Sequence, residues 1–472
     1  MMDGERLLDL LTKEGADYAE VRFHRSVEVS ALLKNGEAEP PEYSEVYGVG
    51  VRVLKGGSLA FASTNILDWE SLKSTGLRAL RMAEACARHS ARTGMSEEPA
   101  VKRDWGVDFK EDPTEVEAST ILEVLRSVDS SLLEVKGVSF PNRLLVFGGS
   151  LEEKEYLNSE GTRMRSIVPR VGGYFILTAS IGGRGTVQRT LQFGESGGWE
   201  RVGSMKLSEV AREEGEAMAR ILMEGRAVLP GRYDVVVGGE VSGIIAHEGC
   251  GHPQEADRIM GREGAQAGES YVKRDMLGRR IGSPAVNISD LPSLPNSYGF
   301  YLYDDEGVEV RKKRLIVGGV INEFLHNRET AREFGVKSNG AARATMYSRE
   351  PIIRMSNTFV EPGDHSLEEL LEGVKHGIYI KSFREWNIDD IRWNNRYVGF
   401  ESYLVEGGEI GQPVVAPVIE ATTEVIFSSI DAVGDDLIFK AATCGKGQPD
   451  QGAPVWTGGP SMRMRGLYIK GR

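Results

Sequence analysis

Residues 46 to 64 read Val-Tyr-Gly-Val-Gly-Val-Arg-Val-Leu-Lys-Gly-Gly-Ser-Leu-Ala-Phe-Ala-Ser-Thr. Two alternating runs flank Lys55-Gly56-Gly57, the pattern of antiparallel strands joined by a tight turn. Tyr18 to Leu33 alternates in the same way. Further strands are expected at 137–147, 154–168 and 173–182, each bounded by Gly, Asn or Pro. The first part of the chain therefore predicts an antiparallel sheet.

The helical patterns divide the chain into two parts. Amphipathic spacing predicts helices at 3–14, 68–89, 114–134 and 207–224. Leu229-Pro230-Gly231-Arg232 ends the last of these, and a short apolar strand at 233–237 follows. Beyond it we expect mostly short strands and loops, with helices near 327–333 and 366–375. A chain of 472 residues exceeds the size at which one core usually stops growing. We predict an α+β protein with an N-terminal mixed α+β domain (1–228) and a mostly β C-terminal domain (229–472).

Charge and cysteine content narrow the classes of function. A formal net charge of −13 disfavours nucleic-acid binding, and the basic run at 311–314 is interpreted as a solvated turn or strand edge. Cys86, Cys250 and Cys444 are too few for a disulfide framework and favour a reducing compartment, with Cys86 expected to be buried in its helix. The N-terminus is acidic where a signal peptide is basic, and no run approaches the ~20 apolar residues of a membrane span. We expect a cytoplasmic protein with no membrane partner.

The predicted strand at 233–237 leads to His247-Glu248-Gly249-Cys250-Gly251-His252. In the common H-E-x-x-H motif, i,i+4 spacing puts two metal-binding imidazoles on one helix face. Here the spacing is i,i+5, which a regular α-helix would separate by roughly 140°. Gly249 and Gly251 permit non-standard backbone, and Pro253 disfavours a regular helical turn. We therefore predict a helix from about Ser242, distorted across 249–253 by a single π-type turn that returns both histidines to one side.

A zinc peptidase needs three protein ligands, an open position for metal-activated water, and a carboxylate that takes the water's proton. Glu248, next to the first histidine, is the candidate general base. The third ligand has four candidates: Cys250, Glu255, Asp257, and Cys444 in a predicted Gly-rich loop. Cys250 is crowded between the two histidines, whereas a Gly-rich backbone can approach a metal closely. The residues alone favour Cys444 modestly and leave the other candidates open.

Taken together, the motif and the downstream cysteine resemble the TldD branch of the TldD/PmbA family of metallopeptidases. The resemblance covers most of the chain as an ordered series of short matches. These are 48–54 with 61–64, His247 to Asp257, Asp304-Asp305-Glu306-Gly307, Asn339 to Arg343, Arg354 to Thr358, Gly377-Ile378-Tyr379, and Cys444-Gly445-Lys446-Gly447-Gln448. One stretch departs from the pattern. Where the family usually has a Gly-rich segment ending in Gly-x-Phe, this chain has Phe383 to Trp393 before Gly399-Phe400-Glu401.

The resemblance implies zinc (Zn2+) bound by His247, His252 and Cys444, with Glu248 as catalytic base. It implies a metallopeptidase that cleaves unstructured peptides or flexible protein segments. It also implies a heterodimer with a PmbA/TldE-like subunit that lacks the metal motif; a homodimer is the alternative. The alternative function is a non-catalytic zinc-binding adaptor or regulatory protein. The departure at 383–393 means that the cleavage preference of relatives is not transferred to this chain.

Overall fold

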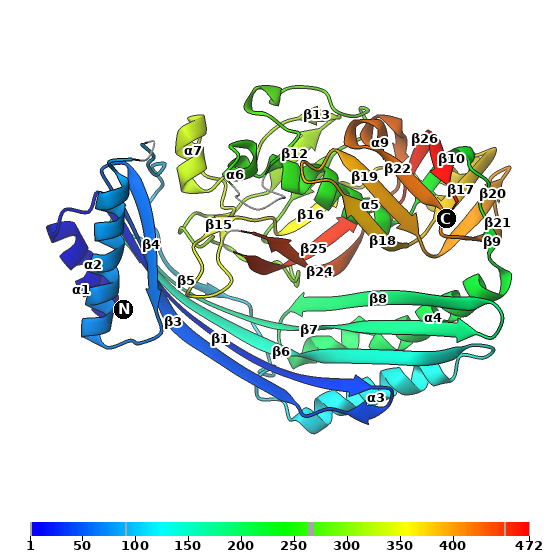
Figure 1. Ribbon diagram of the computed structural model, residues 1–472, viewed down its shortest axis with the longest axis horizontal. Helices are drawn as coiled ribbons and strands as arrows, with labels where there is room; N and C mark the ends of the chain where they lie inside the picture. The colour runs from blue at the N-terminus through cyan, green and yellow to red at the C-terminus, as the bar shows by residue number, and fades with distance from the viewer. Residues whose placement is uncertain (1, 90–91, 263–268, 448–449, 472) are drawn as a thin grey trace.

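Figure 1 shows the computed structural model, which describes residues 2–89, 92–262, 269–447 and 450–471. A long, curved sheet from the first half of the chain cradles the second half on its concave side. Helices cover the outer side of that sheet. The predicted α+β class is confirmed. Gln448, the last residue of the family match around Cys444, lies outside the described residues.

Within the described ranges the curved sheet has eight strands in the order β4-β3-β1-β6-β7-β5, with β2 added to β1 and β8 to β7. They are β1 (Tyr18–Lys34), β2 (Glu37–Ala38), β3 (Glu42–Lys55), β4 (Ser58–Thr64), β5 (Lys102–Gly106), β6 (Ser139–Asn158), β7 (Arg163–Ile181) and β8 (Gly185–Ser196). The predicted hairpin is β3–β4. Its turn holds Gly56 and Gly57 at φ of 60° and 80°, a region that glycine enters without a Cβ clash.

The prediction of three short strands between 137 and 182 is wrong. Two long strands, β6 and β7, occupy this stretch, and their glycine pairs lie opposite one another instead of ending strands. A Cβ on Gly148 would lie 2.0 Å from the carbonyl oxygen of Val29, and a Cβ on Gly173 would lie 2.0 Å from that of Val146. These glycines are therefore needed where neighbouring backbones approach closely within the ladder. Strand β8, which follows, was not predicted.

The two faces of β1 carry different side chains because successive residues point to opposite sides of a sheet. Ala19 and Val21 pack with α1 (Met2–Lys13) and α2 (Trp69–Cys86), and Ala31 and Leu33 pack in the core that α3 and α4 cover. The last two helices are α3 (Ala118–Leu133) and α4 (Leu207–Glu224). All four confirm the helices expected from amphipathic spacing.

The opposite face of the sheet is charged, yet it is buried by the C-terminal half of the chain. Arg52 Nε lies 2.9 Å from a carboxylate oxygen of Glu20 on the same sheet, and its NH2 lies 2.5 Å from Glu306 of the C-terminal half. Arg22 donates to the carbonyl oxygen of Arg349 at 2.6 Å. Buried charges are tolerated when they are paired in this way. The network joins the curved sheet to the C-terminal half.

The C-terminal half is built on two further sheets and a two-stranded ribbon within the described residues. The larger sheet runs β18 (Phe383–Ile388), β19 (Asn394–Gly399), β22 (Val418–Thr422), β26 (Met462–Lys470), β10 (Gly231–Val237), β17 (His376–Ile380), β20 (Ser402–Glu406), β21 (Glu409–Val415) and β9 (Arg226–Ala227), with β23 (Ile430–Val433) on β26. The smaller runs β13 (Val320–Ile321), β12 (Lys313–Val317), β11 (Ile288–Asp290), β16 (Asn357–Val360), β25 (Gln451–Gly459) and β24 (Ile438–Lys446). The ribbon is β14 (Ala342–Arg343) with β15 (Ile352–Ile353).

Short helices connect these sheets. They are α5 (Gly239–Ala246), α6 (Ala256–Ile259), α7 (Arg328–Phe334), α8 (Leu367–Glu372) and α9 (Thr423–Ser429). Helices α7 and α8 and strand β10 confirm the elements predicted for this half. Helix α5 packs in the larger core of this half, together with residues of both sheets. The core therefore holds the start of the histidine motif in place.

Two expectations about single residues are wrong. Lys313 is buried at the start of β12 with its Nζ 3.1 Å from Asp290 Oδ1, whereas Arg311, Lys312 and Arg314 are exposed as expected. Cys86 is exposed at the end of α2.

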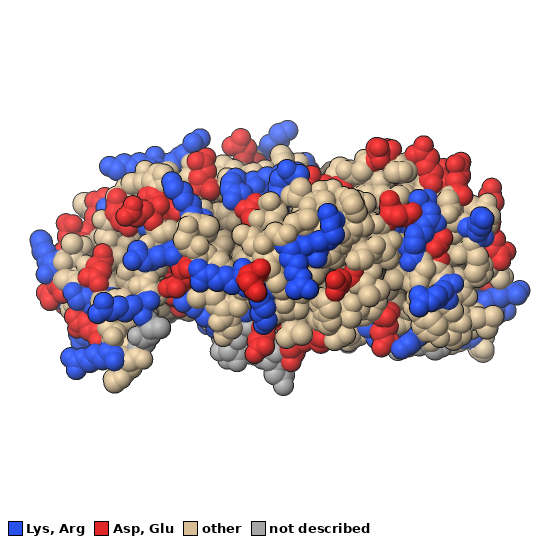
Figure 2. Space-filling model, turned by 90° about the horizontal axis from the view of Figure 1, so that it is seen from above, with Lys and Arg blue, Asp and Glu red and all other residues tan. Residues whose placement is uncertain are grey.

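On the face shown in Figure 2, acidic and basic side chains are interspersed. Across the described residues, no helix combines the length and apolar character needed to cross a membrane.

Candidate metal centre

The histidine motif forms a distorted extension of α5. Residues His247–Gly251 make one π-turn, in which the His252 N–H donates to the carbonyl oxygen of His247, five residues back. A 3-10 turn at His252–Gln254 follows. The two imidazole rings lie with centroids 4.9 Å apart. The predicted π-type turn is confirmed, although α5 begins at Gly239, three residues before the expected start.

Gly251 has a different role from the one predicted. Gly251 has φ −58° and ψ −63°, an ordinary right-handed helical conformation. A Cβ at this position would lie 1.9 Å from the Met355 sulfur. A side chain is therefore excluded by packing beneath the turn and not by backbone conformation.

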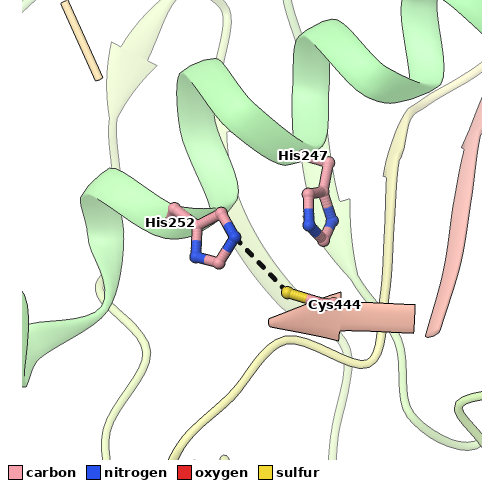
Figure 3. A group of neighbouring side chains, drawn as sticks. All are labelled: His247, His252 and Cys444. Carbon is pink, nitrogen blue, oxygen red and sulfur yellow. Dashed lines mark hydrogen bonds between the residues drawn. The ribbon is translucent and has the colours of Figure 1, made fainter. Parts of the chain in front are cut away.

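Cys444 is the third member of the cluster. It lies on β24, where it pairs with Ala453 of β25, so the prediction of a Gly-rich loop is wrong. Its sulfur is 3.3 Å from His252 Nε2, and potential ligand atoms of His247, His252 and Cys444 all lie within 4.8 Å of one another. Figure 3 shows the two imidazoles above the cysteine. In the described part of the chain this is the one group of three His, Cys, Asp or Glu side chains close enough to hold a metal.

The other candidate ligands lie elsewhere. Cys250 is fully buried in the apolar core, and this burial raises the pKa of its thiol well above the usual range. Glu255 Oε2 lies 3.1 Å from His252 Nδ1, the ring nitrogen opposite the one facing Cys444. Asp257 binds Lys446 Nζ at 2.8 Å through both carboxylate oxygens. The geometry thus brings Cys444 together with the two histidines. None of the other three candidate ligands belongs to this group.

Charge around the cluster favours ionised ligands and a fixed ring orientation. Burial opposes ionisation of the Cys444 thiol, but His252, His247 and Arg354 outweigh it and hold its pKa well below the usual range. Burial also opposes ionisation of Glu255, but Lys446, His252 and Arg258 outweigh it and lower its pKa. A carboxylate on the far nitrogen of a histidine fixes the tautomer that a metal needs.

Glu248 lies beside the cluster without being part of it. Its side chain is only 9 % exposed, and both oxygens meet donors from the segment that departs from the family pattern. Trp386 Nε1 donates to Oε1 at 3.1 Å, and Arg392 NH1 lies 3.3 Å from Oε2. Sequence reasoning missed these two residues, although the divergence of 383–393 was the signal that could have found them.

A cleft of about 490 Å³ opens onto His247, Glu248, His252 and Cys444. Its walls come from three strands, one from each sheet: β8 at 189–193, β18 at 383–386 and β24 at 440–445. In the described ranges the stretches of these strands that line the cleft pair with a neighbouring strand on one side only, although Glu195 near the end of β8 also bridges to Ser297. The cleft is therefore bordered by strand edges whose backbone groups can pair with another chain.

The fold and the site together define an α+β protein whose candidate metal centre offers two imidazoles and a thiol, with a carboxylate beside them. The chain belongs to the PmbA/TldA metallopeptidase family: models of its domain 1, central domain and C-terminal domain match residues 19–83, 111–222 and 230–471. The family resemblance drawn from the sequence is thereby confirmed.

Relatives from several organisms match all or part of the chain. It is 30 % identical to a metalloprotease of Methanothermobacter thermautotrophicus, covering 99 % of this chain and 98 % of the relative. A zinc metalloprotease TldD homologue of Saccharolobus solfataricus is 35 % identical over 53 % of this chain and 54 % of its own length. TldE from Thermococcus kodakarensis has a similar fold, with a TM-score of 0.75, 18 % identity, and coverage of 99 % of this chain and 100 % of TldE.

Proposed function

We propose that the protein is a zinc-dependent peptidase in which His247, His252 and Cys444 hold the metal and Glu248 is the general base. The donor set fits zinc, which takes imidazole nitrogen and thiolate sulfur and keeps one position open in catalytic sites. His247 Nδ1 is buried without a hydrogen-bond partner in the described structure, as expected of a ring whose partner is a bound ion. A bound zinc ion would supply Lewis-acid polarisation of the scissile carbonyl and activation of water.

The observation that carries this proposal is Glu248. A structural zinc site closes with a fourth ligand and has no use for a buried carboxylate that lines a cleft beside three ligands. In a peptidase, Glu248 accepts a proton from the attacking water and passes it to the leaving amine. The alternative, a non-catalytic zinc-binding adaptor, gives this carboxylate no role.

The cleft supports a substrate class of extended peptides. Strand edges can bind an unfolded segment by β-addition, in which main-chain hydrogen bonds give affinity with little side-chain selectivity. We therefore propose that unstructured peptides and flexible protein segments are the substrates.

Partner, domains and location belong to the same proposal. The similar fold of TldE and the TldD naming of relatives support pairing with a TldE-like subunit, and a homodimer is the competing outcome of a mass measurement in solution. We divide the chain into domains at 1–228 and 229–472. The three cysteines are free thiols, which favours a reducing compartment, so we place the enzyme in the cytoplasm.

The test is Glu248→Ala. The variant removes the proton acceptor and no ligand, so zinc content should stay at the wild-type level. Peptide hydrolysis, mapped by mass spectrometry of the products, should fall on the order of 10²–10⁴-fold. Unimpaired hydrolysis would reject the role of Glu248, and a zinc-loaded wild-type protein that cleaves no peptide would favour the adaptor.

A further inference from the structure

The β18–β19 hairpin, residues 383–399, reaches the catalytic carboxylate from outside the histidine motif. Trp386 on β18 and Arg392 in the loop after it each contact a different oxygen of Glu248. Glu248 Oε2 has no hydrogen-bond partner in the described structure. The guanidinium of Arg392 forms an ion pair with it and is therefore the contact that holds this oxygen. Residues of one hairpin thus contact both oxygens of the Glu248 carboxylate.

The backbone of Arg392 is in a conformation that needs support. Its φ is 65°, in the left-handed region that a side chain rarely enters at no cost. Asp389 accepts hydrogen bonds from the Trp393 and Asn394 N–H groups, and Arg392 N–H donates to the Asp389 carbonyl at 3.0 Å. Thr423 Oγ1 donates to the Arg392 carbonyl at 2.8 Å. Strained backbone conformations that are held in place by their surroundings cluster at functional sites.

The hairpin loop is also tied to the π-turn itself. Tyr271 N–H donates to the carbonyl oxygen of Ile391, and Tyr271 OH donates to that of Gly249, both at 2.9 Å. The Tyr271 ring also packs against Trp393 with centroids 5.1 Å apart. Gly249 follows Glu248 directly, so this bridge fixes the loop relative to the backbone of the base.

We propose that Trp386 and Arg392 are positioning residues that orient the Glu248 carboxylate for proton transfer. The proposal rests on the proposed peptidase function. A carboxylate fixed at both oxygens has one orientation toward the attacking water, and proton transfer is sensitive to small misplacement. The segment that distinguishes this chain from its family thereby acts through the catalytic base.

The alternative is that these residues only stabilise the hairpin, and variants of the same hairpin separate the two roles. Arg392→Met should lower kcat on the order of 10²-fold with KM close to the wild-type value. Arg392→Lys should recover part of that loss, because a lysine still presents a positive charge to one oxygen. Trp386→Phe should lower kcat while keeping the packing against Phe383, whose ring centroid lies 5.1 Å away.

Arg396→Met is the matched control. Arg396 lies on β19 of the same hairpin and pairs with Glu385 at 2.9 Å instead of Glu248. It should leave kcat unchanged. An equal loss of kcat in Arg396→Met, a change in KM alone, or an Arg392→Lys variant as impaired as Arg392→Met would overturn the proposal.

A second measurement uses the metal-free protein and needs no activity. Arg392→Met leaves a buried carboxylate without its charged partner, so it should lower the denaturant midpoint. In combination with Glu248→Ala it should lower the midpoint by less than the sum of the two single changes. If the midpoint shifts of the two single variants were additive in the double variant, the proposed contact between Arg392 and Glu248 would be refuted, whether or not the enzyme is active. A wild-type protein that cleaves no peptide would instead refute the peptidase function.

Discussion

At the scale of single residues, two buried cysteines differ in what surrounds them. Cys444 faces His252 at 3.3 Å, whereas Cys250 lies in the apolar core. Cys444→Ser should therefore lose most of the bound zinc, and Cys250→Ser should keep most of it. Zinc per mole of protein after dialysis, with circular dichroism to confirm folding, measures both. Reversed effects would show that the third ligand is wrongly assigned.

His326 provides a pH dependence separate from the metal centre. Burial lowers its pKa from 6.5 to about 4, with Glu323 opposing the shift and Arg311 adding to it. The unfolded imidazole is protonated first as pH falls. The stability contributed by the neutral ring is therefore present above pH 6.5 and is lost toward pH 4, by on the order of 3 kcal/mol.

His326→Phe should remove this slope. The loss of the contact between His326 Nδ1 and Thr330, 3.1 Å in the wild type, should lower stability equally at every pH. Denaturant midpoints of both metal-free proteins at pH 7 and pH 4.5 make the comparison. A variant with the full wild-type slope would contradict the assignment to His326.

At the scale of elements, the π-turn depends on the absence of one side chain. Gly251→Ala would place a Cβ against the Met355 sulfur, and overpacking of this kind typically costs about 1–3 kcal/mol. Because His252 follows directly, zinc content should fall along with the free energy of unfolding. Gly203→Ala is the control, since a Cβ there meets no atom within 4 Å and Gly203 lacks a positive φ. Equal stability of both variants would show that the turn yields to the methyl group.

Elements set by local spacing were predictable from the sequence, and those set by distant pairing were not. The four N-terminal helices, the β3–β4 hairpin and the π-turn follow from apolar periodicity, turn glycines and the i,i+5 histidines. The glycine pairs of β6 and β7 looked like strand ends because their partner strands could not be seen in the sequence. For the same reason Cys444 was expected in a loop, although pairing with β25 holds it in a strand. Glu248 and the two histidines could be proposed from the sequence because they adjoin in one motif. Trp386 and Arg392 were missed because they lie far from that motif in sequence.

At the scale of the whole molecule, the cleft exists only because distant parts of the chain meet. Strand β8 comes from the curved N-terminal sheet, whereas β18 and β24 come from the two sheets of the C-terminal half (Figure 1). Thr443 N–H on β24 donates to Gln192 Oε1 on β8 at 3.2 Å, which joins two of these walls. The candidate metal centre therefore opens onto a cleft between the halves of the molecule, with its three side chains almost fully buried.

This enclosure predicts that the form of a substrate matters more than its sequence. The three candidate ligands are each at most 5 % exposed, so a backbone carbonyl reaches them only in an extended segment that enters the cleft. A folded protein would be cut through its transiently unfolded population. For a substrate about 4 kcal/mol stable, the folded form should be cleaved on the order of 10³-fold more slowly than the same chain after denaturing modification. Time courses for both forms, with a flexible-tailed version as positive control, test this. Chelation should abolish cleavage of every form and zinc should restore it, whereas equal rates for folded and modified substrate would refute the enclosed site.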